Sequence, residues 1–198
     1  MTTATNMAHR VCLIIPPSPF LLDERVFMSL GILKVAAVLE RAGITVELLD
    51  LSGVGNFRDA VAGHLAATDT ACFGLTATTP QLPAVRSIVE VLRRLRPQAR
   101  LILGGPHVTL VHAARLQEEK RGHAKRASRA FAQLQNMVDV LVAGDGELAI
   151  FEALGPTPPK TGGRRQSQVG LVPGECPTDQ SPLPGPTSRR RRELSLHD

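Results

Sequence analysis

The sequence predicts an α/β protein whose parallel sheet is covered by helices on both faces. Short apolar runs alternate with helical patterns from Val11 to Leu154. Four of the runs are almost continuously apolar, which is typical of strands that are buried on both faces. The regular alternation of strand and helix favours a parallel sheet over an antiparallel one.

The individual elements follow from the apolar spacing. Strands are predicted at 11–15, 44–50, 71–76, 99–105 and 139–144, and helices at 30–43, 56–68, 85–95, 113–137 and 147–154. The clearest helix has one apolar stripe, formed by Val85, Ile88, Val89, Leu92 and Leu95. We therefore expect a three-layer, flavodoxin-like (Rossmann-like) sheet of five parallel strands in the order 2-1-3-4-5.

The end of the chain differs in composition from the rest. Residues 155–198 are rich in Pro, Gly, Ser and Thr, and they include RRRR at 189–192. We expect a disordered tail, because so few apolar side chains cannot offset the entropy lost on ordering. The predicted organisation is a flexible N-terminus (1–10), one folded domain (11–154) and this tail. We interpret the arginine run as a solvated end, with nucleic-acid binding or a localisation signal as alternatives.

The composition argues against several classes of protein. Aromatic residues make up only 3% of the chain and all are Phe, which argues against a base-stacking nucleic-acid surface. The three cysteines have no metal-site spacing, and Cys12 and Cys72 lie in apolar runs that predict burial. His64, His112 and His123 are expected on the surface. With no secretory signal and no membrane-spanning run, we expect a cytoplasmic protein without a membrane or nucleic-acid partner.

Several common active-site motifs are missing from the sequence. The segment after the first strand, PPSPF (16–20), is proline-rich and has no glycine, so a dinucleotide site of the usual kind is not expected. The sequence holds no Walker-type phosphate loop and no GxSxG nucleophile elbow, and the first strand ends without an acidic cluster.

Small and hydroxylic residues follow the strands. In an open α/β sheet, ligands bind outside the carboxyl ends of the strands, near the point where the strand order reverses. Glycine at such an edge leaves room for a large ligand to approach the backbone. The candidate binding residues are therefore those that follow the first, third, fourth and fifth strands: Pro17, Thr76, Thr78, Thr79, Gly104, Gly105, His107, Gly144, Gly146 and Glu147.

The ordered set of motifs resembles a known family. LGILKVAAVLERAG, VELLDLSG, GLTATTP, LILGGPHVT and DVLVAGDGE are similar to the cobalamin-binding domain at the N-terminus of cobalamin-dependent radical S-adenosylmethionine enzymes. The resemblance covers about 11–154. It implies a corrinoid at the carboxyl edge, with the nucleotide tail beside Thr76, Thr78 and the pair Gly104-Gly105. It also implies that 144–147 is the family's GEGE-like turn, with Asp145 in place of the usual Glu.

Two departures from related families limit the function that the resemblance implies. Arg25 stands where methionine-synthase-type domains carry the histidine that binds cobalt, so a histidine-ligated cobalt of that type is not expected. The Cys-x-x-x-Cys-x-x-Cys motif of the radical enzymes is absent, so we expect no radical catalysis by this chain alone. We expect a stand-alone carrier or a truncated remnant, for example after a frameshift. Its partner would be a radical S-adenosylmethionine domain.

Other interpretations of the same residues remain open at this stage. His107 is interpreted as a polar neighbour of the ligand, with a cobalt ligand or a structural residue as alternatives. The threonines and glycines also fit plain strand ends and tight turns. The basic segment 113–129 is interpreted as a solvated face, with a docking surface as the alternative. For the whole chain, the alternatives are a flavodoxin-like interaction domain without cofactor and, less favoured, a flavin or nucleotide binder.

Overall fold

The six strands form one parallel sheet. The computed structural model describes residues 10–24, 29–122, 125–155 and 168–171. The strands are β1 (Arg10–Ile15), β2 (Thr45–Asp50), β3 (Cys72–Thr76), β4 (Arg100–Gly104), β5 (Val140–Ala143) and β6 (Gln168–Leu171). Their order is β2-β1-β3-β4-β5-β6, and every neighbouring pair is parallel. The predicted fold and the order 2-1-3-4-5 are confirmed.

The strand β6 extends the sheet beyond the five predicted strands. It pairs with β5 from Val140↔Gln168 to Ala143↔Leu171. Disorder was predicted for this segment from its composition, but an edge strand is held by backbone hydrogen bonds, which composition does not reveal. The rest of the predicted tail, including Cys176 and the arginine run, lies outside the described residues, as do Arg25 and His123.

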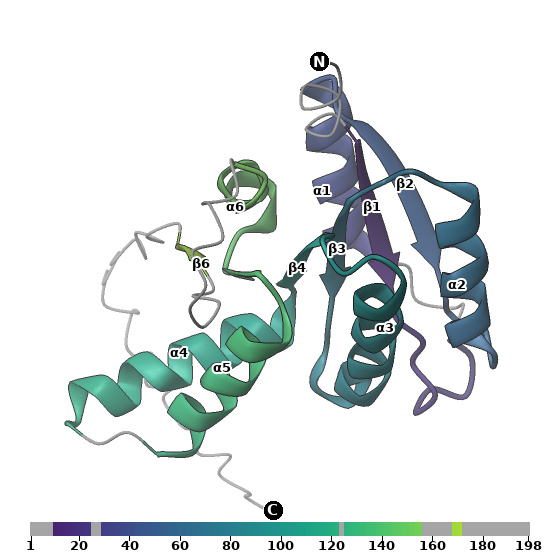
Figure 1. Ribbon diagram of the computed structural model, residues 1–198. Coiled ribbons are helices and arrows are strands. Elements are labelled where there is room, and N and C mark those ends of the chain that lie inside the picture. Colours follow the sequence, from purple (N-terminus) through teal and green to yellow (C-terminus); the bar gives the residue numbers. More distant parts are fainter. Residues whose placement is uncertain (1–9, 25–28, 123–124, 156–167, 172–198) are drawn as a thin grey trace, which may run out of the picture.

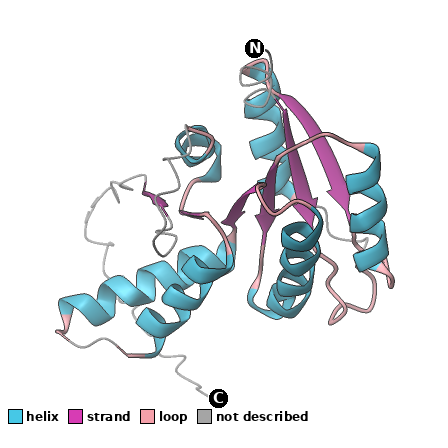
Figure 2. Cartoon of the chain, viewed as in Figure 1, coloured by secondary structure: helices cyan, strands magenta, loops and turns pink. Residues whose placement is uncertain are grey.

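The described residues include six α-helices and one short 3₁₀ helix between and after the strands. They are α1 (Leu30–Arg41), α2 (Phe57–Ala67), η2 (Thr79–Gln81), α3 (Leu82–Leu95), α4 (Pro106–Lys120), α5 (Arg126–Met137) and α6 (Gly146–Ala153). Figure 2 shows the helices on both sides of the strands. None of the helices in the described part of the chain is long and apolar enough to cross a membrane.

The predicted helix 113–137 is wrong in two respects. It begins earlier, because Pro106 sits at the first helical position, where its missing N–H is not needed. It is also divided in two near Gly122, which has φ +69°. The resulting helices α4 and α5 pack together, and this buries His112, which was expected on the surface. The His112 ring centroid lies 5.6 Å from that of Phe131.

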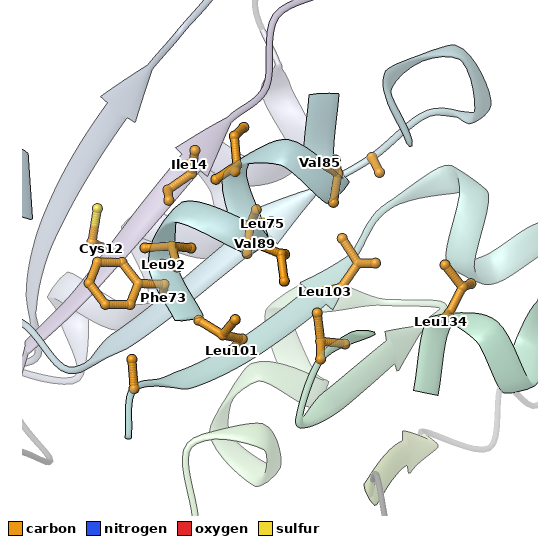
Figure 3. Packing of buried hydrophobic residues seen from close by; sticks show 14 of the residues in the cluster. Cys12, Ile14, Phe73, Leu75, Val85, Val89, Leu92, Leu101, Leu103 and Leu134 are labelled. Carbon is orange, nitrogen blue, oxygen red and sulfur yellow. The ribbon is translucent and has the colours of Figure 1, made fainter. Parts of the chain in front are cut away.

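One face of the sheet is fully packed. Alternate strand residues such as Phe73, Leu101 and Leu103 point into a core that helices α2 to α5 complete (Figure 3). All three side chains are completely buried. We call this side of the sheet the closed face.

Among the described helices, α1 and α6 cover the opposite face of the sheet (Figure 1). Leu13, Ile102 and Val142 point towards it from β1, β4 and β5. By the two-residue alternation of strands, the central strands β3 and β4 also present small residues to this face at their carboxyl ends, namely Gly74, Thr76 and Gly104. We call this side of the sheet the open face.

The two cysteines that the structure describes lie on opposite faces. Cys12 belongs to the core of the closed face and Cys72 to that of the open face, and neither forms a disulfide. The predicted burial of both is confirmed. Burial raises the pKa of each thiol to about 12, so neither is a reactive thiolate near neutral pH.

Candidate functional site

A cleft of about 970 Å³ opens on the open face, at the carboxyl edge of the sheet. This volume is at the upper end of the range of about 300–1,000 Å³ that is usual for ligand pockets. The cleft is lined by the ends of β1, β3, β4 and β5 and by the first turns of α1, α4 and α6. It therefore includes the point between β1 and β3 where the strand order reverses, the expected ligand position in such a sheet.

The floor of the cleft is made of residues with little bulk. Gly74 on β3 lies opposite Ile102 on β4, and Thr76 lies opposite Gly104. A Cβ added at Gly104 would come no closer than 3.6 Å to its nearest neighbour, Val142, which is ordinary van der Waals contact. Protein packing therefore does not require glycine at position 104, and the space above it belongs to the cleft.

The neighbouring Gly105 is needed by the fold itself. Its φ is +96°, and an added Cβ would lie 2.6 Å from Thr76 Oγ1 and 2.7 Å from the Ala77 nitrogen. The contact is close because the turn into α4 presses against the loop after β3. There the Ala77 nitrogen donates to the Gly104 carbonyl at 3.1 Å, and the His107 nitrogen donates to the Ala77 carbonyl at 2.9 Å. The two glycines of the pair therefore have different roles.

A buried glutamine joins the two loops at the reversal point. Gln81 Nε2 donates to the Pro16 carbonyl at 3.1 Å and to Ser18 Oγ at 2.7 Å. Its Oε1 accepts from the backbone nitrogen and the hydroxyl of Thr78, at 2.9 and 3.0 Å. Gln81 is not among the residues predicted from the sequence, although Thr78-x-x-Gln81 has the spacing of a capping box and is a usable signal.

A glutamate that was not among the predicted site residues fixes the loop after β1. One carboxylate oxygen of Glu24 accepts from the Ser18 nitrogen at 2.5 Å and from the Gly53 nitrogen at 2.9 Å. Both Glu24 and Gln81 line the cleft. Together they hold three loops in place around its mouth before any ligand is present.

The two cleft threonines differ in what their hydroxyls already do. The Thr78 hydroxyl donates to Gln81, so it takes part in holding the loop. The Thr76 hydroxyl has no hydrogen-bond partner among the described residues, although it lies at the floor of the cleft. Thr76 is therefore the better placed of the two to contact a ligand.

An acidic pair at the start of α6 forms part of the rim. Asp145 caps the helix by accepting from the Glu147 nitrogen at 3.1 Å, and Lys34 Nζ on α1 lies 3.3 Å from the Glu147 carboxylate. The side-chain hydrogen bond between the two carboxyls raises the pKa of Asp145 and lowers that of Glu147, and Lys34 further lowers the pKa of Glu147. The pair thus joins α6 to α1 across one end of the cleft.

Of the ten predicted binding residues, seven line the cleft: Thr76, Thr78, Gly104, Gly105, Gly144, Gly146 and Glu147. Pro17, Thr79 and His107 lie outside its lining. His107 is in the first turn of α4, is buried, and has its Nδ1 at 2.9 Å from the Thr79 hydroxyl. Burial lowers the pKa of His107, so the ring is neutral near pH 7. A direct contact between any of the ten and a ligand stays a prediction.

Two solved structures that resemble this fold come from one enzyme. They are structures of the radical S-adenosylmethionine methyltransferase TsrM from Kitasatospora setae, one with a tryptophan substrate and a S-adenosylmethionine analog and one with cobalamin and a [4Fe-4S] cluster. Each is 19% identical, with TM-scores of 0.53 and 0.54 over 74% and 75% of this chain. The chain spans only about a quarter of TsrM, namely 25% and 24% of the two solved chains.

A third solved structure, the curated proteins and the family models were also compared with this chain. A cobalamin-binding protein from Desulfitobacterium hafniense DCB-2 is 18% identical over 66% of this chain and 60% of its own, with a TM-score of 0.39. No curated protein matches the sequence. The family model described as the B12 binding domain matches residues 24–134, which is more than half of the chain and contains the floor of the cleft. The chain belongs to the B12 binding domain family.

Proposed function

We propose that this chain holds cobalamin in the cleft and presents it to a separate catalytic domain. The observation that carries the proposal is the floor over β3 and β4, where Thr76 and Gly104 border the cleft between α1 and α6. The room above Gly104 fits a ligand that lies against the backbone, because an added Cβ there would meet only Val142, at 3.6 Å or more. The family match supports cobalamin as that ligand.

The residues of the cleft suggest how the cofactor is held. The floor residues and the apolar side chains of Ile102 and Val142 would contact the nucleotide tail, and the Thr76 hydroxyl would donate a hydrogen bond to it. Gln81 and Glu24 would act as positioning residues, since their hydrogen bonds hold the loops around the mouth in place. When bound, cobalamin supplies a cobalt centre that carries a methyl group.

The carrier role is proposed because the chain lacks the means for radical chemistry. The sequence holds no Cys-x-x-x-Cys-x-x-Cys motif. It matches about a quarter of TsrM, a methyltransferase solved with both cobalamin and an iron–sulfur cluster. A partner domain would therefore supply the methyl acceptor site and the cluster.

We also propose that no histidine of the described chain binds the cobalt. His107 lies outside the cleft lining, and its Nδ1 is engaged with Thr79. His107 then serves the fold by fixing the first turn of α4 against the loop after β3.

The test of cofactor binding is retention of the corrin chromophore. The purified chain is incubated with hydroxocobalamin and desalted, and its visible spectrum is recorded together with its circular dichroism. We expect near-stoichiometric retention. A folded chain that keeps no corrin absorbance contradicts the proposal and favours an interaction domain without cofactor. Retention with a cobalt spectrum that changes in His107→Ala contradicts the assigned role of that histidine.

A matched pair of variants locates the binding site. Gly104→Leu fills the cleft floor, whereas Gly63→Leu places the same side chain on the exposed surface of α2, where an added Cβ meets nothing within 4 Å. We expect Gly104→Leu to reduce cobalamin retention at least about tenfold and Gly63→Leu to leave it unchanged, since only the first side chain occupies the ligand's volume. Equal retention by the two variants would place the cofactor elsewhere.

A further inference from the structure

Three metal-ligating side chains meet beneath α2, on the closed face of the sheet. They are Cys12 on β1, Glu47 on β2 and His64 on α2, and one ligand atom from each lies within 4.8 Å of the other two. Cys12 and Glu47 are direct partners in the β1–β2 pairing. Because two strands and a helix fix the three residues, their arrangement does not depend on a loop.

The two distances from His64 Nε2 are close to those between neighbouring ligand atoms of a tetrahedral metal ion, and the third pair of atoms lies within 4.8 Å. His64 Nε2 lies 3.4 Å from Cys12 Sγ and 3.0 Å from a carboxylate oxygen of Glu47. Zn–S bonds of about 2.3 Å and Zn–N bonds of about 2.0–2.1 Å place neighbouring ligand atoms of a tetrahedral site about 3.5 Å apart. Sulfur, imidazole nitrogen and carboxylate oxygen are also the three donor types that zinc accepts.

The carboxylate is oriented by further contacts. The hydroxyls of Thr68 and Thr70 both donate to Oε1 of Glu47 at 2.8 Å, which leaves Oε2 for His64. Such hydrogen bonds to a ligating carboxylate are typical of metal sites. The Arg10 guanidinium lies 3.6 Å from Oε1 of Glu47, and its positive charge disfavours a cation at the cluster. The same guanidinium nitrogen, Nη1, is paired with the Asp69 carboxylate at 2.9 Å.

Hydrogen bonding uses the three groups unequally. A proton on His64 Nε2 is donated to the Glu47 carboxylate, and the Cys12 sulfur, 3.4 Å from the same nitrogen, is then only a weak acceptor. A divalent ion would bind all three atoms, and thiolate and carboxylate together would neutralise its charge.

We propose that Cys12, Glu47 and His64 bind a zinc-type divalent cation, with one coordination position left for water. The site is independent of the cobalamin cleft, since it lies on the other face of the sheet. Binding forms a bond from the metal to sulfur and releases the thiol proton to solvent. With ligands from β1, β2 and α2, the ion would tie the edge of the sheet to the helix that covers it.

The test uses the full chain without cobalamin, under reducing conditions, in a Cys176→Ser background that removes the third thiol. Co²⁺ is added as a spectroscopic probe, and Zn²⁺ affinity is measured by competition with a chromophoric chelator. We expect one equivalent of Co²⁺ to give a thiolate-to-cobalt charge-transfer band, which Zn²⁺ abolishes. Failure of wild-type protein to give this band contradicts the proposal, whatever the result with hydroxocobalamin.

Variants assign the ligands. Cys12→Ser and His64→Gln should lose the band, and Cys72→Ser, which changes the buried cysteine of the other face, should keep it. Thr68→Val leaves all three ligands in place and should weaken Zn²⁺ binding about 10–100-fold through the loss of one orienting hydrogen bond. If Cys12→Ser does not fold, His64→Gln decides, because the His64 side chain is partly exposed. A band that survives in either ligand variant overturns the assignment.

Discussion

The two faces of the sheet are built from the same strands but serve different purposes. On the closed face, helices α2 to α5 cover the sheet and bury large side chains such as Phe73 and Leu103 completely. On the open face, two of the described helices, α1 and α6, cover the sheet, and the central strands carry Gly74, Thr76 and Gly104 at their carboxyl ends. The cleft lies where small residues of β3 and β4 meet the gap between α1 and α6 in the described part of the chain.

This difference separates stability from ligand binding. Side chains of the closed face fill space that no ligand enters, so changes there should act on folding. Thr76 and Gly104 on the open face border space that the described protein does not fill, so changes there should act on binding. The predictions below test this separation, beginning with the largest expected effect.

Adjacent residues of β4 provide the first test, because Leu103 points to the closed face and Ile102 to the open face. We expect Leu103→Ala to lower the free energy of unfolding by about 3–5 kcal/mol and Ile102→Ala by about 2–3 kcal/mol. The smaller loss follows because the space left by Ile102 joins the existing cleft and forms no enclosed cavity. Urea unfolding of the cofactor-free protein measures both, and equal losses would contradict the comparison.

The glycine pair gives the second test. Gly105→Ala forces a side chain into φ +96° and against Thr76 and Ala77. We expect a loss of at least about 1–3 kcal/mol from the backbone conformation. Gly104→Ala should change stability by less than about 0.5 kcal/mol. Thermal unfolding of the two variants checks this, and a Gly104→Ala protein as unstable as Gly105→Ala would show that packing also requires glycine at 104.

Removal of the Thr76 hydroxyl should have a third, smaller effect, and this prediction rests on the proposed function. Thr76→Val removes a hydroxyl that has no partner within the described chain, so stability should be unchanged. Cobalamin affinity should fall about 2–10-fold, as expected for one hydrogen bond of about 0.5–1.5 kcal/mol. Thr78→Val is the control, since it breaks the bond to Gln81 and should lower the unfolding midpoint. Unchanged affinity in Thr76→Val would remove Thr76 from the binding site.

The strand order was predictable because buried parallel strands leave a strong pattern of apolar runs. The edge residues that line the cleft were predictable for the same reason, since each follows the end of such a run. The sequence could not separate Gly104 from Gly105, because only the folded turn shows which one lies against Thr76. It also could not place His107, whose contact with Thr79 depends on where α4 begins.

Other features depend on contacts between distant segments. Gln81 looks like an ordinary polar residue until its bonds to Pro16 and Ser18 are seen, which cross from β3 to β1. After the break near Gly122, the start of α5 is held by Glu118, whose carboxylate accepts hydrogen bonds from it. Local periodicity contains no information about such contacts.

The same glutamate provides the last test, which is confined to the closed face. Desolvation opposes ionisation of Glu118, but hydrogen bonds from Ala127, Ser128 and Lys125 outweigh it and lower its pKa from 4.5 to about 2. A group whose pKa is lowered on folding stabilises the protein above its unfolded pKa, and this contribution is lost as the pH falls towards 2.

Wild type should therefore be more stable than Glu118→Gln at pH 7, and the difference should shrink between about pH 5 and pH 2. Urea midpoints of both proteins across this range measure the effect. A constant difference would mean that ionisation of Glu118 does not hold α5 in place. Cobalamin retention at pH 7 should be equal in the two proteins, because Glu118 lies outside the cleft lining.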